Sequence, residues 1–176
     1  LNMAWRFLLL ICGLWTFVVS PGYGFDRYTA HGGPVRGLAL SPDGSKLVTA
    51  SFDYSAVVWG ARALQEQLTL LGHEAAVNAA AFSADGSILA TAGDDGLILL
   101  WTEEQLRQDA AKPVVLRGHK GKIVDLEFSN DGKMLASASW DGSIGIWPLG
   151  ETTLDEGQSP RFITGHEGSV NAVQFS

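Results

Sequence analysis

Three of the four histidines stand at a constant distance from an aspartate and a tryptophan, and His and Asp are residue types from which metal and acid–base sites are built. Each of the first three histidines is followed by an aspartate 22 positions later and by a tryptophan 28 positions later. The three sets are His31, Asp53 and Trp59; His73, Asp95 and Trp101; and His119, Asp141 and Trp147. Because every histidine takes the same place in its repeat, each is expected in its own structural unit, apart from the others. The spacing therefore predicts neither a metal site nor a catalytic residue.

Other chemical motifs are also missing from the sequence. There is no Gly-rich phosphate loop and no Cys-His haem motif, so no cofactor is expected. The single cysteine, Cys12, lies near the start of the chain, which leaves no thiol for catalysis or metal binding elsewhere.

The repeat that carries these residues has the hydrophobic pattern of β-strands. In each copy, apolar residues stand four, seven and nine positions after the histidine, and a fourth copy begins at His166. A step of three followed by a step of two is typical of a strand with one bulge. An Asp-Gly turn leads from this run to a second one, a third run ends in the tryptophan, and a fourth strand is expected before the next histidine. The expected second strands are 46–51, 88–93 and 134–139, the third are 56–59, 98–101 and 144–147, and the fourth are 67–71, 114–117 and 161–164.

Four short strands repeated every 42 to 47 residues cannot bury both faces of their sheet alone, so neighbouring copies must stack. With Gly-His at its start and Trp at its end, the unit resembles the WD40 repeat family, whose β-propellers are built from four-stranded antiparallel blades. The resemblance covers residues 25–176, with repeats at about 25–59, 67–101, 114–147 and 161–176. It departs from the family in Ala30 before the first histidine and in the lack of Asp after each tryptophan. Because closed propellers have about four to eight blades, the expected fold is an all-β, incomplete propeller.

The resemblance implies a buried hydrogen-bonded tetrad of His, Ser or Thr, Asp and Trp within each blade. Carried over, the hydroxyl would come from Ser51 in the first copy and from Ser139 in the third, while Gly93 leaves the second tetrad incomplete. His166 would open a fourth tetrad. On this interpretation the conspicuous polar residues brace the fold and do no catalysis.

In propellers of this family, partners usually dock on the rim where the first strands begin. We use "rim" for the positions three and five after the histidine and the one just before the turn aspartate. The candidate binding residues there are Arg36, Phe52, Asn78, Asp94, Lys122 and Trp140. Aromatic and arginine side chains often dominate interface energetics. The alternative is that the large rings of Phe52 and Trp140 only cover their own blades.

The start of the chain has the form of a secretory signal peptide over residues 3–24. One basic residue precedes an apolar run of 13 residues from Phe7 to Val19, and Gly22 and Gly24 suit signal peptidase cleavage after Gly24. An uncleaved membrane anchor is the alternative, although a spanning helix needs about 20 residues. The sequence thus predicts an exported protein, periplasmic or extracellular, that is not bound to a membrane once the signal is removed.

The net charge and the number of repeats limit which functions the sequence is compatible with. Twelve Lys and Arg against 19 Asp and Glu give a net charge of −7, which disfavours nucleic acid or an anionic membrane surface as partner. We therefore expect a non-catalytic scaffold that binds a protein or peptide, with self-association through its open blade edges possible. Two alternatives stay open: an accessory propeller of a longer exported enzyme or c-type cytochrome, and a truncated gene remnant.

Overall fold

The computed structural model describes residues 30–107, 112–150 and 159–176. The predicted signal peptide at 3–24 lies outside these residues. Within them the chain forms twelve β-strands and one short 3-10 helix, η1 (Gln105–Arg107). No helix in these ranges is long and apolar enough to cross a membrane.

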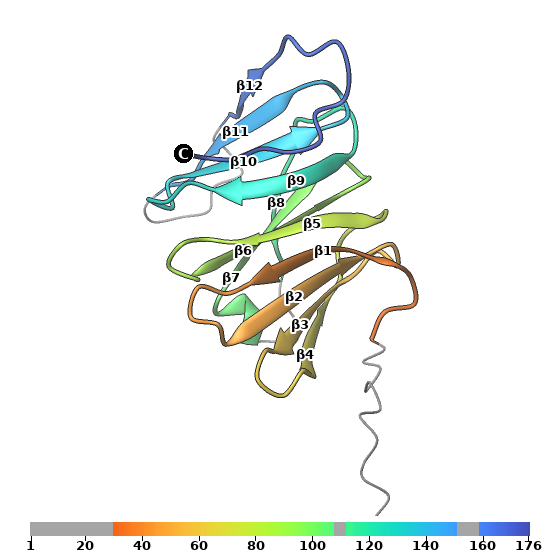
Figure 1. Ribbon diagram of the computed structural model, residues 1–176, viewed down its shortest axis with the longest axis vertical. Helices are drawn as coiled ribbons and strands as arrows, with labels where there is room; N and C mark the ends of the chain where they lie inside the picture. The colour runs from red at the N-terminus through yellow and green to blue at the C-terminus, as the bar shows by residue number, and fades with distance from the viewer. Residues whose placement is uncertain (1–29, 108–111, 151–158) are drawn as a thin grey trace, which may run out of the picture.

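Three antiparallel four-stranded sheets make up the fold, and we call each sheet a blade. Blade 1 contains β1 (Val35–Leu40), β2 (Lys46–Ser51), β3 (Ala56–Gly60) and β4 (Gln65–Leu70). Blade 2 contains β5 (Val77–Phe82), β6 (Ile88–Gly93), β7 (Ile98–Thr102) and β8 (Val114–Leu116). Blade 3 contains β9 (Ile123–Phe128), β10 (Met134–Ser139), β11 (Ile144–Pro148) and β12 (Arg161–Ile163). In each blade the strands pair in chain order, and the first strands β1, β5 and β9 lie next to one another (Figure 1).

The observed strands confirm the expected all-β fold closely. The second strands have the predicted bounds, and the third strands are each one residue longer than expected. The fourth strands differ more, since β4 begins at Gln65 and each of the three ends one residue early. The fourth copy forms no strand ladder within the described residues; its segment lies along β9, where the Val173 and Phe175 N–H groups donate to the carboxylates of Asp125 and Glu127.

The predicted bulge is present in the first strand of every blade. Val35 pairs with Ser51 but the next paired residue is Gly37, which leaves Arg36 as the extra residue. Asn78 is skipped in the same way between β5 and β6, and Val124 between β9 and β10. A bulge re-aims the side chain that it carries. All three extra residues stand at the rim position five after the histidine.

Turns between the strands follow from serine, aspartate and glycine. In blade 1 the Ser41 hydroxyl donates to the Asp43 carboxylate at 2.6 Å, and Gly44 adopts a φ of 67°. Blades 2 and 3 repeat this arrangement. The next turn of blade 1, between β2 and β3, has no glycine at its left-handed position. Tyr54 takes a φ of 71° there, a conformation that residues other than glycine rarely adopt.

Two apolar cores join the blades. In the first, Leu89, Leu99 and Trp101 of blade 2 pack on Val48 and Val58 of blade 1. In the second, the matching face of blade 3 packs on blade 2 through Ile123, Leu126, Phe128, Leu135 and Trp147. The tryptophan face of each of these blades is thus buried by the blade before it.

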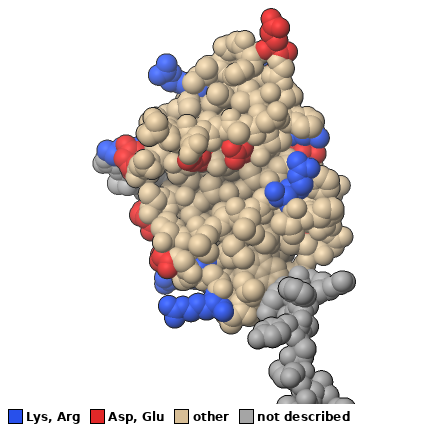
Figure 2. Space-filling model, viewed as in Figure 1, with Lys and Arg blue, Asp and Glu red and all other residues tan. Residues whose placement is uncertain are grey.

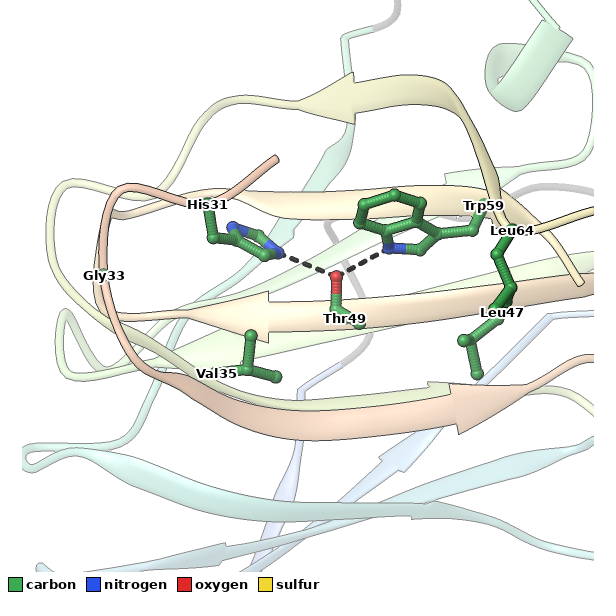
Figure 3. A pocket seen from close by; sticks show the side chains of 7 residues that line it. All are labelled: His31, Gly33, Val35, Leu47, Thr49, Trp59 and Leu64. Atoms are coloured by element: carbon green, nitrogen blue, oxygen red, sulfur yellow. Dashed lines mark hydrogen bonds between the residues drawn. The ribbon is translucent and has the colours of Figure 1, made fainter. Parts of the chain in front are cut away.

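The tryptophan face of blade 1 has no such cover among the described residues. Leu38 and Leu40 are 66% and 58% exposed there, whereas the equivalent Leu126 and Phe128 of blade 3 are buried. A cavity of about 320 Å³ opens on the same face (Figure 3). Blade 1 therefore presents to solvent the kind of surface that blades 2 and 3 bury.

Candidate binding rim

Each blade contains a hydrogen-bonded tetrad that includes its histidine, aspartate and tryptophan. In blade 1 the His31 Nδ1 lies 2.9 Å from Asp53, and the His31 Nε2 and the Trp59 Nε1 lie 2.7 and 2.9 Å from the Thr49 hydroxyl (Figure 3). Blade 2 repeats these contacts with Thr91 at 3.0 and 3.2 Å. The equivalent distances to Ser137 in blade 3 are 2.7 and 2.8 Å.

The hydroxyl of the tetrad differs from the one that the sequence predicted. It comes from Thr49, Thr91 and Ser137, two residues before the expected positions, so the assignment of Ser51 and Ser139 was wrong. Both positions face the same side of the strand, but Trp59 pairs with Leu47, and its indole reaches only the next residue on that face. Sequence alone gave a signal for the correct position, since the residue 18 positions after the histidine carries a hydroxyl in all three copies.

The hydroxyl groups of Ser51 and Ser139 instead hydrogen-bond to the loop that carries the histidine and hold it in place. Ser51 donates to the Gly33 carbonyl at 3.1 Å, and Ser139 donates to the Lys122 carbonyl at 3.1 Å. Gly93 takes their place in blade 2 because a Cβ there would overlap the Ala76 carbonyl oxygen. The tetrad of blade 2 is therefore complete, contrary to the prediction.

Hydrogen bonds keep the tetrad aspartates ionised. Burial acts to raise the pKa of Asp53, but donors from Ser55, His31 and the Gly32 N–H outweigh it and lower the pKa to about 2. The pKa of Asp141 is lowered well below its usual range in the same way. Because these carboxylates are already bonded to donors inside their blades, they are poorly placed to act as general bases. Among the residues that the structure describes, no three His, Cys, Asp or Glu side chains gather where they could bind a metal ion.

His166 of the fourth copy stands apart from this pattern. It is exposed, and no tetrad partner meets it within the described residues.

The rim residues of blades 2 and 3 form one connected network. The Lys122 ammonium donates to Asp94 at 3.2 Å and lies 4.7 Å from the centre of the Trp140 ring. The Trp140 indole donates to the Asn171 side-chain oxygen at 3.0 Å, and the Asn78 amide donates to Asp94 at 2.7 Å. This network therefore crosses the boundary between blades 2 and 3 and reaches the fourth copy.

Exposure separates the candidate residues into two groups. Trp140 is 48% exposed and Phe52 is 40% exposed, so each ring presents a large surface to solvent. Asn78 is only 6% exposed and also donates to the Ile123 carbonyl, which makes it a brace between blades 2 and 3. In blade 1, Arg36 is exposed with its guanidinium 5.2 Å from the centre of the Phe52 ring. The network also includes Asn171, which stands at the rim position five after His166 but was not among the six candidate binding residues.

Charges on the face seen in Figure 2 are scattered. Lysine and arginine side chains stand singly or in small groups there, with aspartate and glutamate between them, on a surface that is mostly uncharged. A basic stripe of the kind that tracks a phosphate backbone is not seen on this face.

The stacked four-stranded blades, each braced by a His–Asp and Trp–hydroxyl tetrad, define a β-propeller repeat protein. Comparison with known families agrees: the WD domain, G-beta repeat (WD40) matches residues 25–60, 64–102 and 112–148. The chain belongs to the WD40 repeat family. No curated protein matches it. Domains built from WD40 repeats generally act as non-catalytic scaffolds for protein–protein interaction.

Proposed function

We propose that this chain is a non-catalytic scaffold of an exported protein and that it binds a protein or peptide partner on its rim. The observation that supports this most directly is Trp140, a half-exposed aromatic ring held in place by Lys122 and Asn171. Tryptophan is among the residues that contribute most to binding at interfaces. A ring that is already fixed loses little conformational entropy when a partner covers it.

The binding experiment starts with a displayed library of random peptides of twelve residues, selected on the full chain. The selected peptides are then measured against Trp140→Ala and against Met134→Ala, an apolar control that is exposed at the opposite end of β10. We expect Trp140→Ala to weaken binding about tenfold or more and Met134→Ala to leave it unchanged. Peptides that bind both variants equally well would place the site elsewhere and refute the rim proposal.

Self-association is a second proposal, and it rests on the open tryptophan face of blade 1. Leu38 and Leu40 leave an apolar stripe there that is buried at the equivalent place in blade 3. Exposed apolar patches of this kind favour association. Sedimentation velocity at increasing concentration should show oligomers for the natural chain and fewer for Leu38→Glu, with melting curves to verify folding. A natural chain that stays monomeric across the range would rule this out.

Export is proposed from the sequence pattern of residues 3–24 alone. The basic residue, the apolar run and the two small residues near Gly24 support it. The test is a fusion of residues 1–30 to a reporter enzyme that is active only after export, together with the mass of the processed protein. We expect activity and a start at Phe25; a cytoplasmic, unprocessed fusion would contradict the proposal.

A further inference from the structure

The carboxylate and the indole N–H of the rim network are already hydrogen-bonded. One oxygen of Asp94 accepts from Asn78 and the other accepts from Lys122. The indole N–H of Trp140 is taken by Asn171. The Asp94 side chain is 30% exposed and its oxygens can accept further bonds, but each already has a donor, so a cation or donor on a partner gains less there than at an unbonded carboxylate.

What remains open at the rim consists of donors and apolar surface. The exposed Arg36 guanidinium stacks near Phe52 and has no carboxylate partner within the described residues. The Lys122 ammonium has three N–H donors, and its side chain is still 40% exposed beside Asp94. The side-chain oxygen of Asn171, an exposed residue, already accepts the indole N–H, so its amide N–H groups are what this side chain can offer to a partner. A partner that satisfies these groups must supply acceptors.

We propose that the rim recognises an acidic peptide segment, with carboxylates bound by Arg36 and Lys122 and an apolar side chain packed on Trp140. This inference rests on the proposed rim function and names the chemistry of the partner. Guanidinium and ammonium groups form their strongest hydrogen bonds with carboxylates. The half-exposed rings of Phe52 and Trp140 supply the apolar area that a purely electrostatic contact would lack.

The spacing of the two cations suggests the spacing of the acids. Arg36 belongs to blade 1 and Lys122 precedes β9 of blade 3, so they stand two blades apart. The first strands lie closer together than packed sheets usually do, because a Cβ on Gly37 of β1 would lie 3.1 Å from the Cα of Ala79 in β5. An extended chain advances about 3.3 Å per residue, so a bound peptide that reaches both cations would place its two carboxylates only a few residues apart.

The overall negative charge of the chain does not oppose such a contact strongly. The net charge is −7, but at physiological ionic strength charges more than about 8 Å away are largely screened. Local cations then decide the interaction, and binding should weaken as salt is raised.

The test uses the peptide library described above. It determines the composition of the selected peptides and measures how their binding changes when each of the two cations is replaced. We expect the selected peptides to be rich in Asp and Glu close to an aromatic residue or Leu. Arg36→Gln and Lys122→Gln should each weaken binding about fivefold or more, and changing Asp to Asn in the peptide should do the same. Arg62→Gln is the matched control, because Arg62 is an exposed arginine in the turn between β3 and β4, at the far end of the blade.

The outcomes separate this inference from the proposed function. Neutral or basic peptides that lose affinity on Trp140→Ala, or acidic peptides indifferent to both cation variants, would overturn the acidic preference and leave the rim function standing. Peptides that ignore Trp140→Ala, Arg36→Gln and Lys122→Gln alike would overturn both, and so would a selection that yields no binder. Arg36→Gln removes a side chain outside the Asp94 network, so its effect cannot be ascribed to loss of that network.

Discussion

Replacing Thr91 by valine tests the hydrogen-bond arrangement in the tetrad of blade 2. Thr91 is fully buried, and its hydroxyl oxygen lies 3.0 Å from the His73 Nε2 and 3.2 Å from the Trp101 Nε1. With the His73 Nδ1–H donated to Asp95, the threonine O–H donates to Nε2 and its oxygen accepts the indole N–H. Valine has nearly the same shape but can make neither bond.

The expected loss of stability follows from the two polar atoms that valine leaves without partners. An unsatisfied buried donor or acceptor costs about 1–3 kcal/mol, so losing both partners should lower the free energy of unfolding by about 3 kcal/mol. Thr91→Ser keeps the hydroxyl and removes one methyl group, which should cost about 1 kcal/mol. Thr69→Val makes the same chemical change on the exposed strand β4 and should stay within about 0.5 kcal/mol of the natural chain.

Urea unfolding followed by far-ultraviolet circular dichroism measures these differences, provided that the dependence on urea is the same for all variants. The order expected is Thr69→Val, then Thr91→Ser, then Thr91→Val as the least stable. If Thr91→Val were as stable as Thr91→Ser, the hydroxyl would not be satisfying buried partners, and the account of the tetrad would fail.

Three other predictions test local features. Asp53 has a folded pKa of about 2, below its unfolded value of about 3.9, so its contribution to stability is present above pH 4 and is lost as the pH falls towards 2. Urea unfolding between pH 5 and 2.5 should show this loss of stability, and the loss should be smaller in Asp53→Asn. Tyr54→Gly should raise the free energy of unfolding by about 0.5–1 kcal/mol, because glycine adopts the φ of 71° without strain; a lower melting temperature would contradict this. Gly93→Ser should destabilise the chain by about 2 kcal/mol or more, since its Cβ would overlap the Ala76 carbonyl, whereas a gain in stability would revive the view that blade 2 lacks its hydroxyl.

Local sequence patterns were enough to predict the strands. The alternation of apolar residues and the Asp-Gly turns depend on neighbours within about ten positions, and the observed β2, β6 and β10 have the expected bounds. The bulge in each first strand was also predicted correctly, because it shifts the apolar spacing from two to three.

Pairing between strands and between blades was harder to predict. Positions 49 and 51 lie on the same face of β2, and the pairing of Leu47 with Trp59 shows that Thr49, and not Ser51, meets the indole. The one sequence signal for this choice was that position 18 after the histidine carries a hydroxyl in all three copies, whereas position 20 does not. The ion pair between Lys122 and Asp94 joins two blades, and nothing in either repeat alone indicates it. The repeat pattern does place Asn171 on the rim, five positions after His166, but its bond to Trp140 depends on where the fourth copy lies.

The bulges have a consequence for how new specificities arise on this scaffold. Arg36 and Val124 are extra residues that no partner on the neighbouring strand opposes, so changing them leaves the register of the sheets untouched. These two positions can therefore be substituted, in evolution or in a randomised library, while the blades keep their fold. Asn78 is the exception, because its buried amide joins two blades, and we expect it to tolerate far fewer replacements than its two counterparts.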